Sequence, residues 1–293
     1  MKEVNYKKPF LIAEIGCNHK GDMEIAKELI KIAKIFCNAD AVKFQKRNNR
    51  ELLTEEQYNA PHPNPANSYG DTYGAHREYL EFDLEQNREL KEYCESLGIV
   101  YSTSVWDLTS AKEIASINPQ FIKIPSACNN NYTMLEWLCG NYKGEIHIST
   151  GMTTKDETEE LVSFFEKHGR AKDLVLYNCT SGYPVPFHDV CLLEINRLRE
   201  KYEDRVKHIG FSGHHLGIAI DIAAYTLGAS IIERHYTLDR TWKGTDHAAS
   251  LEPMGMRKLA RDLAATYEAL TYKNKDILDI EMVQREKLKN RKG

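Results

Sequence analysis

Short apolar runs alternate with amphipathic stretches along most of the chain. The runs have the length and the branched or aromatic content of buried strands, and they lie at 10–15, 41–45, 99–104, 121–125, 146–150, 174–179, 208–212 and 229–234. The stretches between them repeat apolar residues every three or four positions, which predicts helices at 23–36, around 90–97, 110–116, 132–139, 155–168, 190–202, 218–227 and 254–270. Eight such alternations predict a parallel sheet closed into a (β/α)8 TIM barrel, an α/β fold in a single domain. A doubly wound open sheet is the alternative, but no GxGxxG turn supports it.

One long segment interrupts this alternation after the second predicted strand. Residues 51–83 are rich in Asn, Pro, Gly and Tyr, and loops of this length are usually functional or disordered. The aromatic content favours an ordered loop over the mouth of the barrel. We therefore expect the barrel to cover 1–272, followed by a charged tail at 273–293 that docks loosely or frays.

Polar residues keep one phase in five of the predicted strands. They lie toward the C-terminal ends of the strands and alternate with apolar neighbours: Glu14; Lys43 and Gln45; Lys123; His147 and Ser149; Asn178 and Thr180. Successive side chains of a strand point to opposite faces, and the outer face of a barrel must be apolar because it packs on helices. We therefore expect these polar residues inside the barrel, lining a site at the C-terminal ends of its strands.

Two lysines in this phase predict an anionic ligand. A buried lysine without a partner costs several kcal/mol, so Lys43 and Lys123 require negative charge nearby. Salt-bridged core lysines are the alternative. Together with the polar residues Ser126, Ser149, Asn178 and Ser212, the lysines predict a cup for a phosphate or carboxylate. Glu14 and Asp246 are candidate acid–base groups.

Two histidines follow the last two predicted strands. His214 comes just after 208–212 and His235 just after 229–234, so their rings meet if the strands are adjacent and parallel. Two neutral imidazoles suit a divalent transition metal. The alternative is two unrelated histidines, one at a helix start and one in a polar loop.

Composition narrows the class of protein. The 293 residues carry a net charge of −4, which gives no basic footprint for nucleic acid. No apolar run approaches the roughly 18 residues needed to span a membrane, and the N-terminal stretch lacks the apolar core of a signal peptide. The seven scattered cysteines include no CxxC motif and indicate reduced thiols. We therefore expect a cytoplasmic enzyme that binds neither nucleic acid nor membrane.

Eight ordered motifs resemble the sialic acid synthases. They are AEIGCNHKGD, VKFQ, FIKIPSACNNN, ISTGM, NCTSGYPVPFHDV, GFSGHH, ERHYTLD and GTDHAASLEP, and the resemblance runs from about residue 9 to 272. This family condenses phosphoenolpyruvate with an N-acylmannosamine-type aldose to give a nine-carbon 2-keto acid. The resemblance implies a (β/α)8 barrel and Mn²⁺ or another divalent metal.

The resemblance also assigns roles to residues by position. His214 and His235 match the metal ligands. The positions that match the phosphoenolpyruvate cup are Lys43, Lys123, Ser126, Ser149, Asn178 and Ser212. Those that match the sugar side are Glu14, Gln45, Tyr183 and Asp246, with Glu14 as the acid–base group and Asp246 also assigned a catalytic role.

The segments 72–82 and 241–253 resemble the animal-type synthases, which use a 6-phosphorylated hexosamine. His76 and Arg77 in the long loop, with Lys243 and His247 beside Asp246, predict a second anion site above the barrel mouth. The product would then be a 9-phosphate. The alternatives are that His76 and Arg77 pair with Glu78 or Asp71 on the loop, and that the acceptor is a free sugar.

The resemblance implies a homodimer but stops short of one feature. The family usually carries a C-terminal antifreeze-like domain, whose arginine reaches into the site of a partner subunit, and this chain ends at Gly293 without it. The chain is a fragment, or its sugar needs no such arginine, or a separate antifreeze-like subunit supplies it. Two rival functions stay open: an aldolase that forms a Schiff base on Lys123 or Lys43, and a non-catalytic sugar-phosphate sensor.

Overall fold

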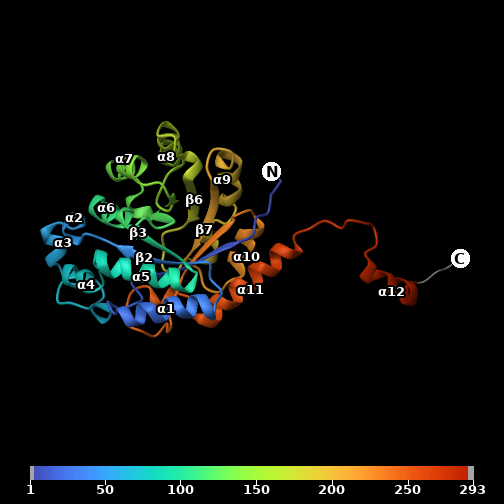
Figure 1. The fold of residues 1–293 in the computed structure, drawn as a ribbon, viewed down its shortest axis with the longest axis horizontal. Helices are drawn as coiled ribbons and strands as arrows, with labels where there is room; N and C mark the ends of the chain where they lie inside the picture. The colour runs from blue at the N-terminus through green and yellow to red at the C-terminus, as the bar shows by residue number, and fades with distance from the viewer. Residues whose placement is uncertain (1–2, 290–293) are drawn as a thin grey trace.

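Eight parallel strands form a closed barrel in sequence order, as the alternation of strands and helices predicted. The structure is a computed structural model, which describes residues 3–289. Each strand pairs with its sequence neighbour, and β1 closes the barrel on β8 (Figure 1). The strands are β1 Phe10–Gly16, β2 Ala41–Lys46, β3 Val100–Val105, β4 Phe121–Ile124, β5 Glu145–Ser149, β6 Leu174–Cys179, β7 His208–Gly213 and β8 Ile231–His235.

Helices surround the barrel, and local sequence signals set their ends. The α-helices are α1 Met23–Ile35, α2 Asn49–Leu52, α3 Glu55–Asn59, α4 Tyr73–Tyr79, α5 Leu84–Leu97, α6 Leu108–Ser116, α7 Tyr132–Asn141, α8 Lys155–Lys167, α9 Glu194–Tyr202, α10 Ala219–Thr226, α11 Pro253–Ala269 and α12 Asp279–Leu288. Five short 3-10 helices lie at Pro65–Asn67, Ser126–Cys128, Ala171–Asp173, Phe187–Val190 and His247–Ala249. The Asp22 carboxylate caps α1, and Thr154 forms a capping box with Glu157 at the start of α8.

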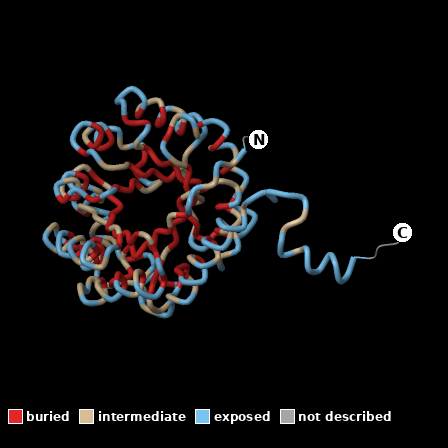
Figure 2. The backbone as a smooth tube through the Cα atoms, turned by 45° about the vertical axis from the view of Figure 1, so that its right-hand side comes forward, coloured by how far each residue is buried: buried red, intermediate tan, exposed pale blue. Residues whose placement is uncertain are grey.

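The buried residues form an inner plug and an outer layer. Inside the barrel, a small apolar cluster contains Ile12, Ala41, Phe121, Val175, Tyr177 and Ile231. The opposite strand faces pack on the helices in one large core, and Figure 2 shows the buried chain concentrated in the barrel wall. The inner cluster fills the barrel toward the N-terminal ends of its strands and so separates a small cavity of about 220 Å³ at that end from the larger opening at the C-terminal ends.

The long segment at 51–83, predicted as an ordered loop over the barrel mouth, contains short helices. It contains α3 and α4, and the Cα of Gly74 approaches the Tyr58 ring so closely that a Cβ there would lie 2.3 Å from it. The Tyr69 hydroxyl donates a hydrogen bond to the carbonyl of Lys243, in the loop after β8. The segment therefore reaches across the barrel mouth to the last βα loop.

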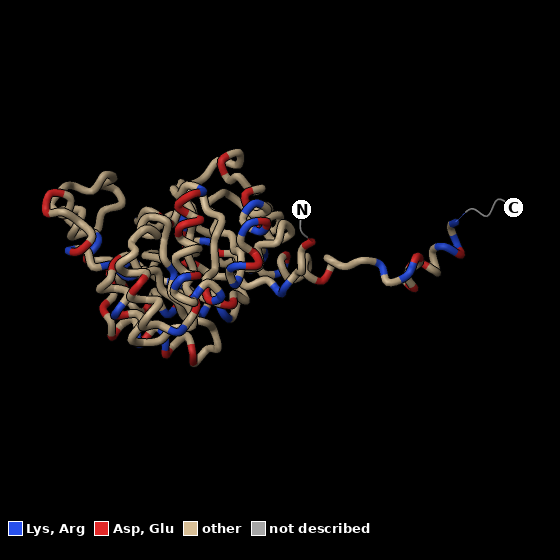
Figure 3. Tube along the Cα trace, turned by 90° about the horizontal axis from the view of Figure 1, so that it is seen from above, with Lys and Arg blue, Asp and Glu red and all other residues tan. Residues whose placement is uncertain are grey.

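The charged tail leaves the barrel after α11. The sequence predicted that it docks loosely or frays, and its described part contains α12, which lies away from the barrel (Figure 1). The end of that predicted tail, 290–293, falls outside the described residues. Figure 3 shows basic and acidic residues interspersed along barrel and tail. Within residues 3–289, no helix is both long enough and apolar enough to cross a membrane.

A buried ion network fastens β8 to the loop after β7. Arg234 lies on the outer face of β8, is 1% exposed, and forms an ion pair with Asp221 of α10. Its guanidinium also donates to the carbonyls of His215 and Gly217, at 2.6 and 2.8 Å. This network holds in place the two strand ends that carry His214 and His235.

We expect Asp221→Ala to lower the free energy of unfolding by about 3–5 kcal/mol, because it leaves the Arg234 guanidinium buried without a counter-ion. The matched control is Asp262→Ala, which removes the partly exposed partner of the exposed Arg261 and should change stability by less than about 1 kcal/mol. Urea unfolding followed by circular dichroism measures both. Equal effects of the two substitutions would contradict the structural role of the network.

Candidate active site

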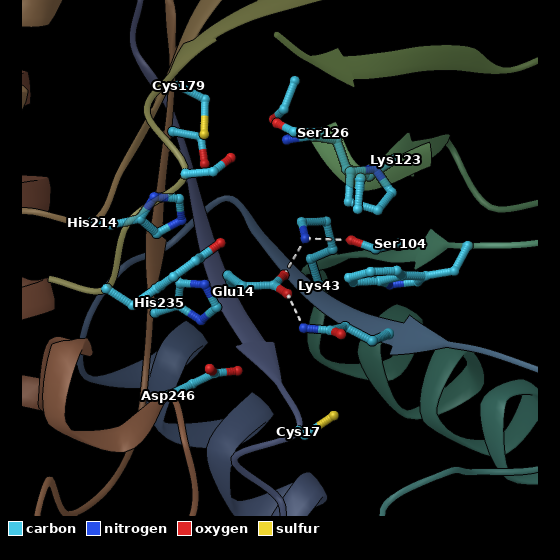
Figure 4. Close-up of a pocket in the computed structure, with 18 of the residues that line it drawn as sticks. Glu14, Cys17, Lys43, Ser104, Lys123, Ser126, Cys179, His214, His235 and Asp246 are labelled. Carbon is cyan, nitrogen blue, oxygen red and sulfur yellow. Dashed lines mark hydrogen bonds and ion pairs between the residues drawn. The ribbon is translucent and has the colours of Figure 1, made fainter. Parts of the chain in front are cut away.

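A cavity of about 420 Å³ opens at the C-terminal ends of the strands (Figure 4). It brings together most of the side chains that the sequence predicted there: Glu14, Lys43, Gln45, Lys123, Ser126, Ser149, Tyr183, Ser212, His214, His235 and Asp246. The strand register explains part of this arrangement, because Glu14 of β1 pairs with Lys43 of β2 on one side and with His235 of β8 on the other. In Figure 4 Glu14 lies between the histidines and the lysines.

Both lysines have carboxylate partners inside the protein. Lys43 forms an ion pair with Glu14 and donates to the Ser104 hydroxyl at 2.7 Å. The Lys123 ammonium lies 3.1 and 3.0 Å from the two carboxylate oxygens of Glu233. The alternative of salt-bridged core lysines therefore describes their contacts within the protein. It does not exclude an anion cup, because both ammonium groups also line the cavity.

Two residues of this network, Glu233 and Ser104, were missing from the predicted site. Glu233 lies on the inner face of β8 in phase with His235, and Ser104 lies at the end of β3 opposite Lys123 in the register. The same alternation that identified Glu14 could have found both. The cavity is also lined by residues that follow strands rather than belong to them, among them Cys17, Arg47, His76, Trp106, Ser181 and Thr245.

The two buried glutamates differ in their affinity for a proton. Burial raises the pKa of Glu14 above its ordinary value, and Lys43 opposes this only in part. Burial also acts to raise the pKa of Glu233, but the ammonium groups of Lys123 and Lys43 hold it at about 2. Glu233 is therefore ionised at neutral pH, whereas Glu14 holds a proton more strongly than an ordinary glutamate. Such a division of two carboxylates suits acid–base chemistry.

The two predicted metal ligands face each other. The ring centroids of His214 and His235 are 5.4 Å apart, and Nδ1 of His214 lies 3.1 Å from the carbonyl oxygen of Thr180. Because a carbonyl only accepts hydrogen bonds, we assign the His214 proton to Nδ1, which leaves Nε2 free to bind a ligand. Burial and the neighbouring His235 lower the pKa of His214 to about 3, so the ring is neutral.

This donor set fits a divalent transition metal with two protein ligands. Nδ1 of His235 is buried and has no hydrogen-bond partner in the protein. Among residues 3–289, no cluster of three or more His, Cys, Asp or Glu is arranged to hold a metal. A metal held by the two histidines would keep positions open for substrate or water, which is typical of catalytic sites. Tyr183 covers this place, with its ring centroid 4.3 Å from that of His214.

The structure does not bring Asn178 to the predicted cup. In β6 the inner face carries Tyr177 and Cys179, so the polar phase assigned to this strand is wrong. The Tyr177 hydroxyl bonds to His147 inside the barrel, which places the aromatic residue inward and the amide outward. Asn178 instead lines a separate cavity of about 750 Å³ beside α8 and α9. Ser181, beyond the strand, takes its place in the active-site cavity.

Arg77 also lies outside the cavity lining. It is buried, with its guanidinium 5.6 and 5.9 Å from the ring centroids of Tyr73 and Trp106, and it pairs with neither Glu78 nor Asp71. Arg47 lines the cavity instead and forms an ion pair with Glu81.

The other three residues of the predicted second anion site lie in different surroundings and do not form one cluster. His76 lines the cavity, but burial and the nearby His62 and Arg47 lower its pKa to about 4, so it adds no charge at neutral pH. Lys243 lies over the Tyr69 ring, and His247 is buried against Thr237. On this side of the cavity, the cation among the lining residues is Arg47.

Gly16 leaves room for the side chains of Glu14 and Gln45 beside it. Its φ is +56°, and a Cβ there would lie 3.1 Å from Gln45 Nε2 and 3.3 Å from Glu14 Oε1. A side chain at this position would therefore strain the backbone and also displace two groups of the site.

We expect Gly16→Ala to reduce kcat/KM on the order of 10²-fold, because small displacements of catalytic groups are that costly. Gly98→Ala is the matched control, since Gly98 has a φ of +68° and no atom within 4 Å of its Cβ position. Both substitutions should lower stability by roughly 1–2 kcal/mol in urea unfolding. A similar loss of activity in both variants would show that Gly16 matters only for folding.

Several known proteins are similar to this chain in sequence and in fold. The NeuB family matches residues 29–275. N-acetylneuraminate-9-phosphate synthase of Homo sapiens is 39% identical over 284 residues, which cover 95% of this chain and 76% of the human protein. N,N'-diacetyllegionaminic acid synthase of Campylobacter jejuni is 33% identical over 265 residues, or 90% of this chain and 78% of that protein. The structure of N-acetylneuraminic acid (sialic acid) synthetase from Leptospira borgpetersenii in complex with citrate has a TM-score of 0.80 at 29% identity, and the match covers 98% of this chain and 95% of that one.

Proposed function

The chain belongs to the NeuB family, and we propose that it joins phosphoenolpyruvate to a 6-phosphorylated aldose of the mannosamine type. The products are a nonulosonic acid 9-phosphate and inorganic phosphate. One observation carries the proposal: two lysines, two glutamates and two histidines converge in a single cavity at the C-terminal end of the barrel. Binding sites for anionic substrates in this fold lie at that end.

The lysine side of the cavity is proposed to hold phosphoenolpyruvate. The Lys43 and Lys123 ammonium groups supply positive charge, and Ser126, Ser149 and Ser212 supply hydroxyl donors around them. Charge-assisted hydrogen bonds of this kind are roughly twice as strong as neutral ones. They would hold the substrate's anionic groups in place while its C3 carbon faces the second substrate.

The histidine side is proposed to hold the aldehyde of the open-chain aldose. His214 and His235 would bind the divalent ion, Mn²⁺ or a similar metal, and such an ion polarises a carbonyl oxygen as a Lewis acid when bound. As C3 of phosphoenolpyruvate bonds to the aldehyde carbon, the aldehyde oxygen needs a proton. Glu14 can donate that proton because burial raises its pKa. Water then adds at C2 and phosphate leaves, which yields the 2-keto acid.

The acceptor phosphate is proposed to bind on the side of Arg47. Arg47 lines the cavity, Arg77 lies behind it, and the Nε of Arg77 is buried without a hydrogen-bond partner. Glu81 faces both guanidinium groups and Asp246 also faces Arg47, so the proposal rests on guanidinium donors for a second anion and not on an excess of positive charge. The similarity to N-acetylneuraminate-9-phosphate synthases supports the same acceptor chemistry.

The Schiff-base alternative has a separate test. Burial lowers the pKa of Lys123, a property that imine-forming lysines also need. Borohydride trapping of labelled substrate on the protein would favour an aldolase. Metal-dependent release of phosphate from phosphoenolpyruvate would exclude both that aldolase and a non-catalytic sensor.

We expect His214→Ala and His235→Ala each to lower turnover by at least about 10²-fold with the fold retained, because a Lewis acid contributes several kcal/mol. Both proteins are first treated with chelator. Calorimetric titration with Mn²⁺ then measures binding, and phosphate release measures activity. His188→Ala, at an exposed histidine outside the cavity, is the control and should behave as wild type. Full Mn²⁺ binding by either site variant would rule out the assigned ligands.

We expect kcat/KM for the 6-phosphorylated aldose to exceed that for the free aldose by about 10²-fold, since a charge-assisted contact to phosphate contributes roughly 1.5–3 kcal/mol. Arg47→Lys keeps the charge but loses the guanidinium fork, and it should narrow this preference about tenfold. Arg50→Lys, at an exposed arginine on the same segment, should leave it unchanged. A wild-type preference for the free sugar would rule out the phosphorylated acceptor while leaving the lysine cup untouched.

A further inference from the structure

A column of polar side chains runs through the apolar interior of the barrel beneath Lys123. The Lys123 ammonium lies 3.7 Å above the centroid of the Tyr177 ring. The Tyr177 hydroxyl is 2.8 Å from Nδ1 of His147, and Nε2 of His147 is 3.3 Å from the carboxylate of Glu145. Tyr177 and His147 are 0% and 1% exposed, so the column crosses the layer that otherwise plugs the barrel.

Each member of the column is held in place by a neighbour. His147 stacks on the Phe121 ring at a centroid distance of 4.1 Å, and Lys207 binds the other oxygen of Glu145 at 2.9 Å. Gly210 lies against the tyrosine, since a Cβ there would be only 2.8 Å from the Tyr177 ring. Burial lowers the pKa of His147 to about 4, so this ring is neutral. It then accepts the Tyr177 hydrogen bond at Nδ1 and donates to Glu145 from Nε2.

The Tyr177 ring can attract the Lys123 ammonium without adding a negative charge to the cavity. The groups that face the Lys123 ammonium are Glu233, Lys43 and Cys179, and burial together with Lys43 disfavours the charged form of Lys123. A second carboxylate would stabilise the cation but would repel an incoming anion. The negative face of an aromatic ring attracts a cation without carrying net charge.

We propose that Tyr177 is a positioning residue for the reaction: its ring is the platform that holds the Lys123 ammonium at the floor of the cavity, and His147 and Glu145 fix the ring from below. The inference rests on the proposed role of Lys123 in binding phosphoenolpyruvate. It adds Tyr177, His147 and Glu145, which lie outside the lining of the active-site cavity.

The first test separates the ring from its hydroxyl. Tyr177→Leu removes the platform and should raise the KM for phosphoenolpyruvate about tenfold, with the KM for the aldose changed by less than about twofold. Tyr177→Phe keeps the ring face and should return the phosphoenolpyruvate KM to within about threefold of wild type. The control is Tyr101→Leu, at a buried tyrosine on the outer face of β3 that bonds to Asn87 and Thr103. It should lower the melting temperature without this selective rise in KM.

A graded test keeps the side-chain shape and so does not depend on the fold of Tyr177→Leu. Phenylalanine, difluorophenylalanine and pentafluorophenylalanine are placed at position 177 by nonsense suppression. Fluorine withdraws electrons from the ring face, so the phosphoenolpyruvate KM should rise stepwise along the series while the aldose KM stays constant. A flat series, or equal rises in both KM values, would overturn the platform.

Lys123→Met distinguishes failure of the inference from failure of the proposed function. If this variant binds phosphoenolpyruvate as wild type does, both the proposed role of Lys123 and the platform role of Tyr177 are overturned. If Lys123→Met weakens phosphoenolpyruvate binding but the fluorinated series is flat, the lysine cup stands and only the platform is overturned. A loss in Lys123→Met together with a graded series supports both.

Discussion

The burial of charge at the open end of an apolar barrel is the constraint on which this site depends. Lys43, Lys123, Glu14 and Glu233 are each less than a tenth exposed, and removing one such ion from water costs several kcal/mol. That cost is offset only because each cation has a carboxylate beside it and each carboxylate a cation. The four side chains therefore act as one unit, in which the loss of any member leaves another buried charge uncompensated.

The closed barrel makes such a unit possible. Its strand register sets Glu14 between Lys43 and His235, and this order is fixed by backbone hydrogen bonds rather than by flexible loops. The apolar plug supports the charges from below, and the Arg234–Asp221 network fixes the last strand from outside. Preorganised charge of this kind needs little rearrangement when an anion arrives, which is the property that electrostatic catalysis requires.

The sequence predicted the fold and most of the strand residues that line the cavity because both follow from a period of two. A strand that is apolar on one face and carries Glu14 or Lys43 on the other leaves a single choice for the inner face. That logic fails in β6, where Asn178 lies between Tyr177 and Cys179 and both faces carry groups that can form hydrogen bonds. Tyrosine is counted as apolar in such a pattern, yet the Tyr177 hydroxyl forms a hydrogen bond with His147 inside the barrel.

Some cavity residues outside the strands escaped prediction for a different reason. Arg47 and Ser181 follow β2 and β6, and no periodicity says where a loop side chain will point. Arg77 was placed on the correct loop, but its guanidinium packs between aromatic rings instead of lining the cavity. Loop residues are positioned by contacts with distant segments, such as the hydrogen bond from Tyr69 to Lys243. The local sequence pattern carries no information about such contacts.

The unequal pKa values of the two glutamates link the charge network to the chemistry. With Glu233 ionised and both lysines charged, the network is neutral when Glu14 is ionised and carries one positive charge when Glu14 is protonated. An anion bound beside the lysines favours the protonated form, because like charges disfavour ionisation of a nearby carboxyl. Binding of phosphoenolpyruvate would therefore raise the pKa of Glu14 further. In the proposed reaction, the proton for the aldehyde oxygen would then be present when the carbon–carbon bond forms. The charge proposed to bind phosphoenolpyruvate would also prepare Glu14 as the acid.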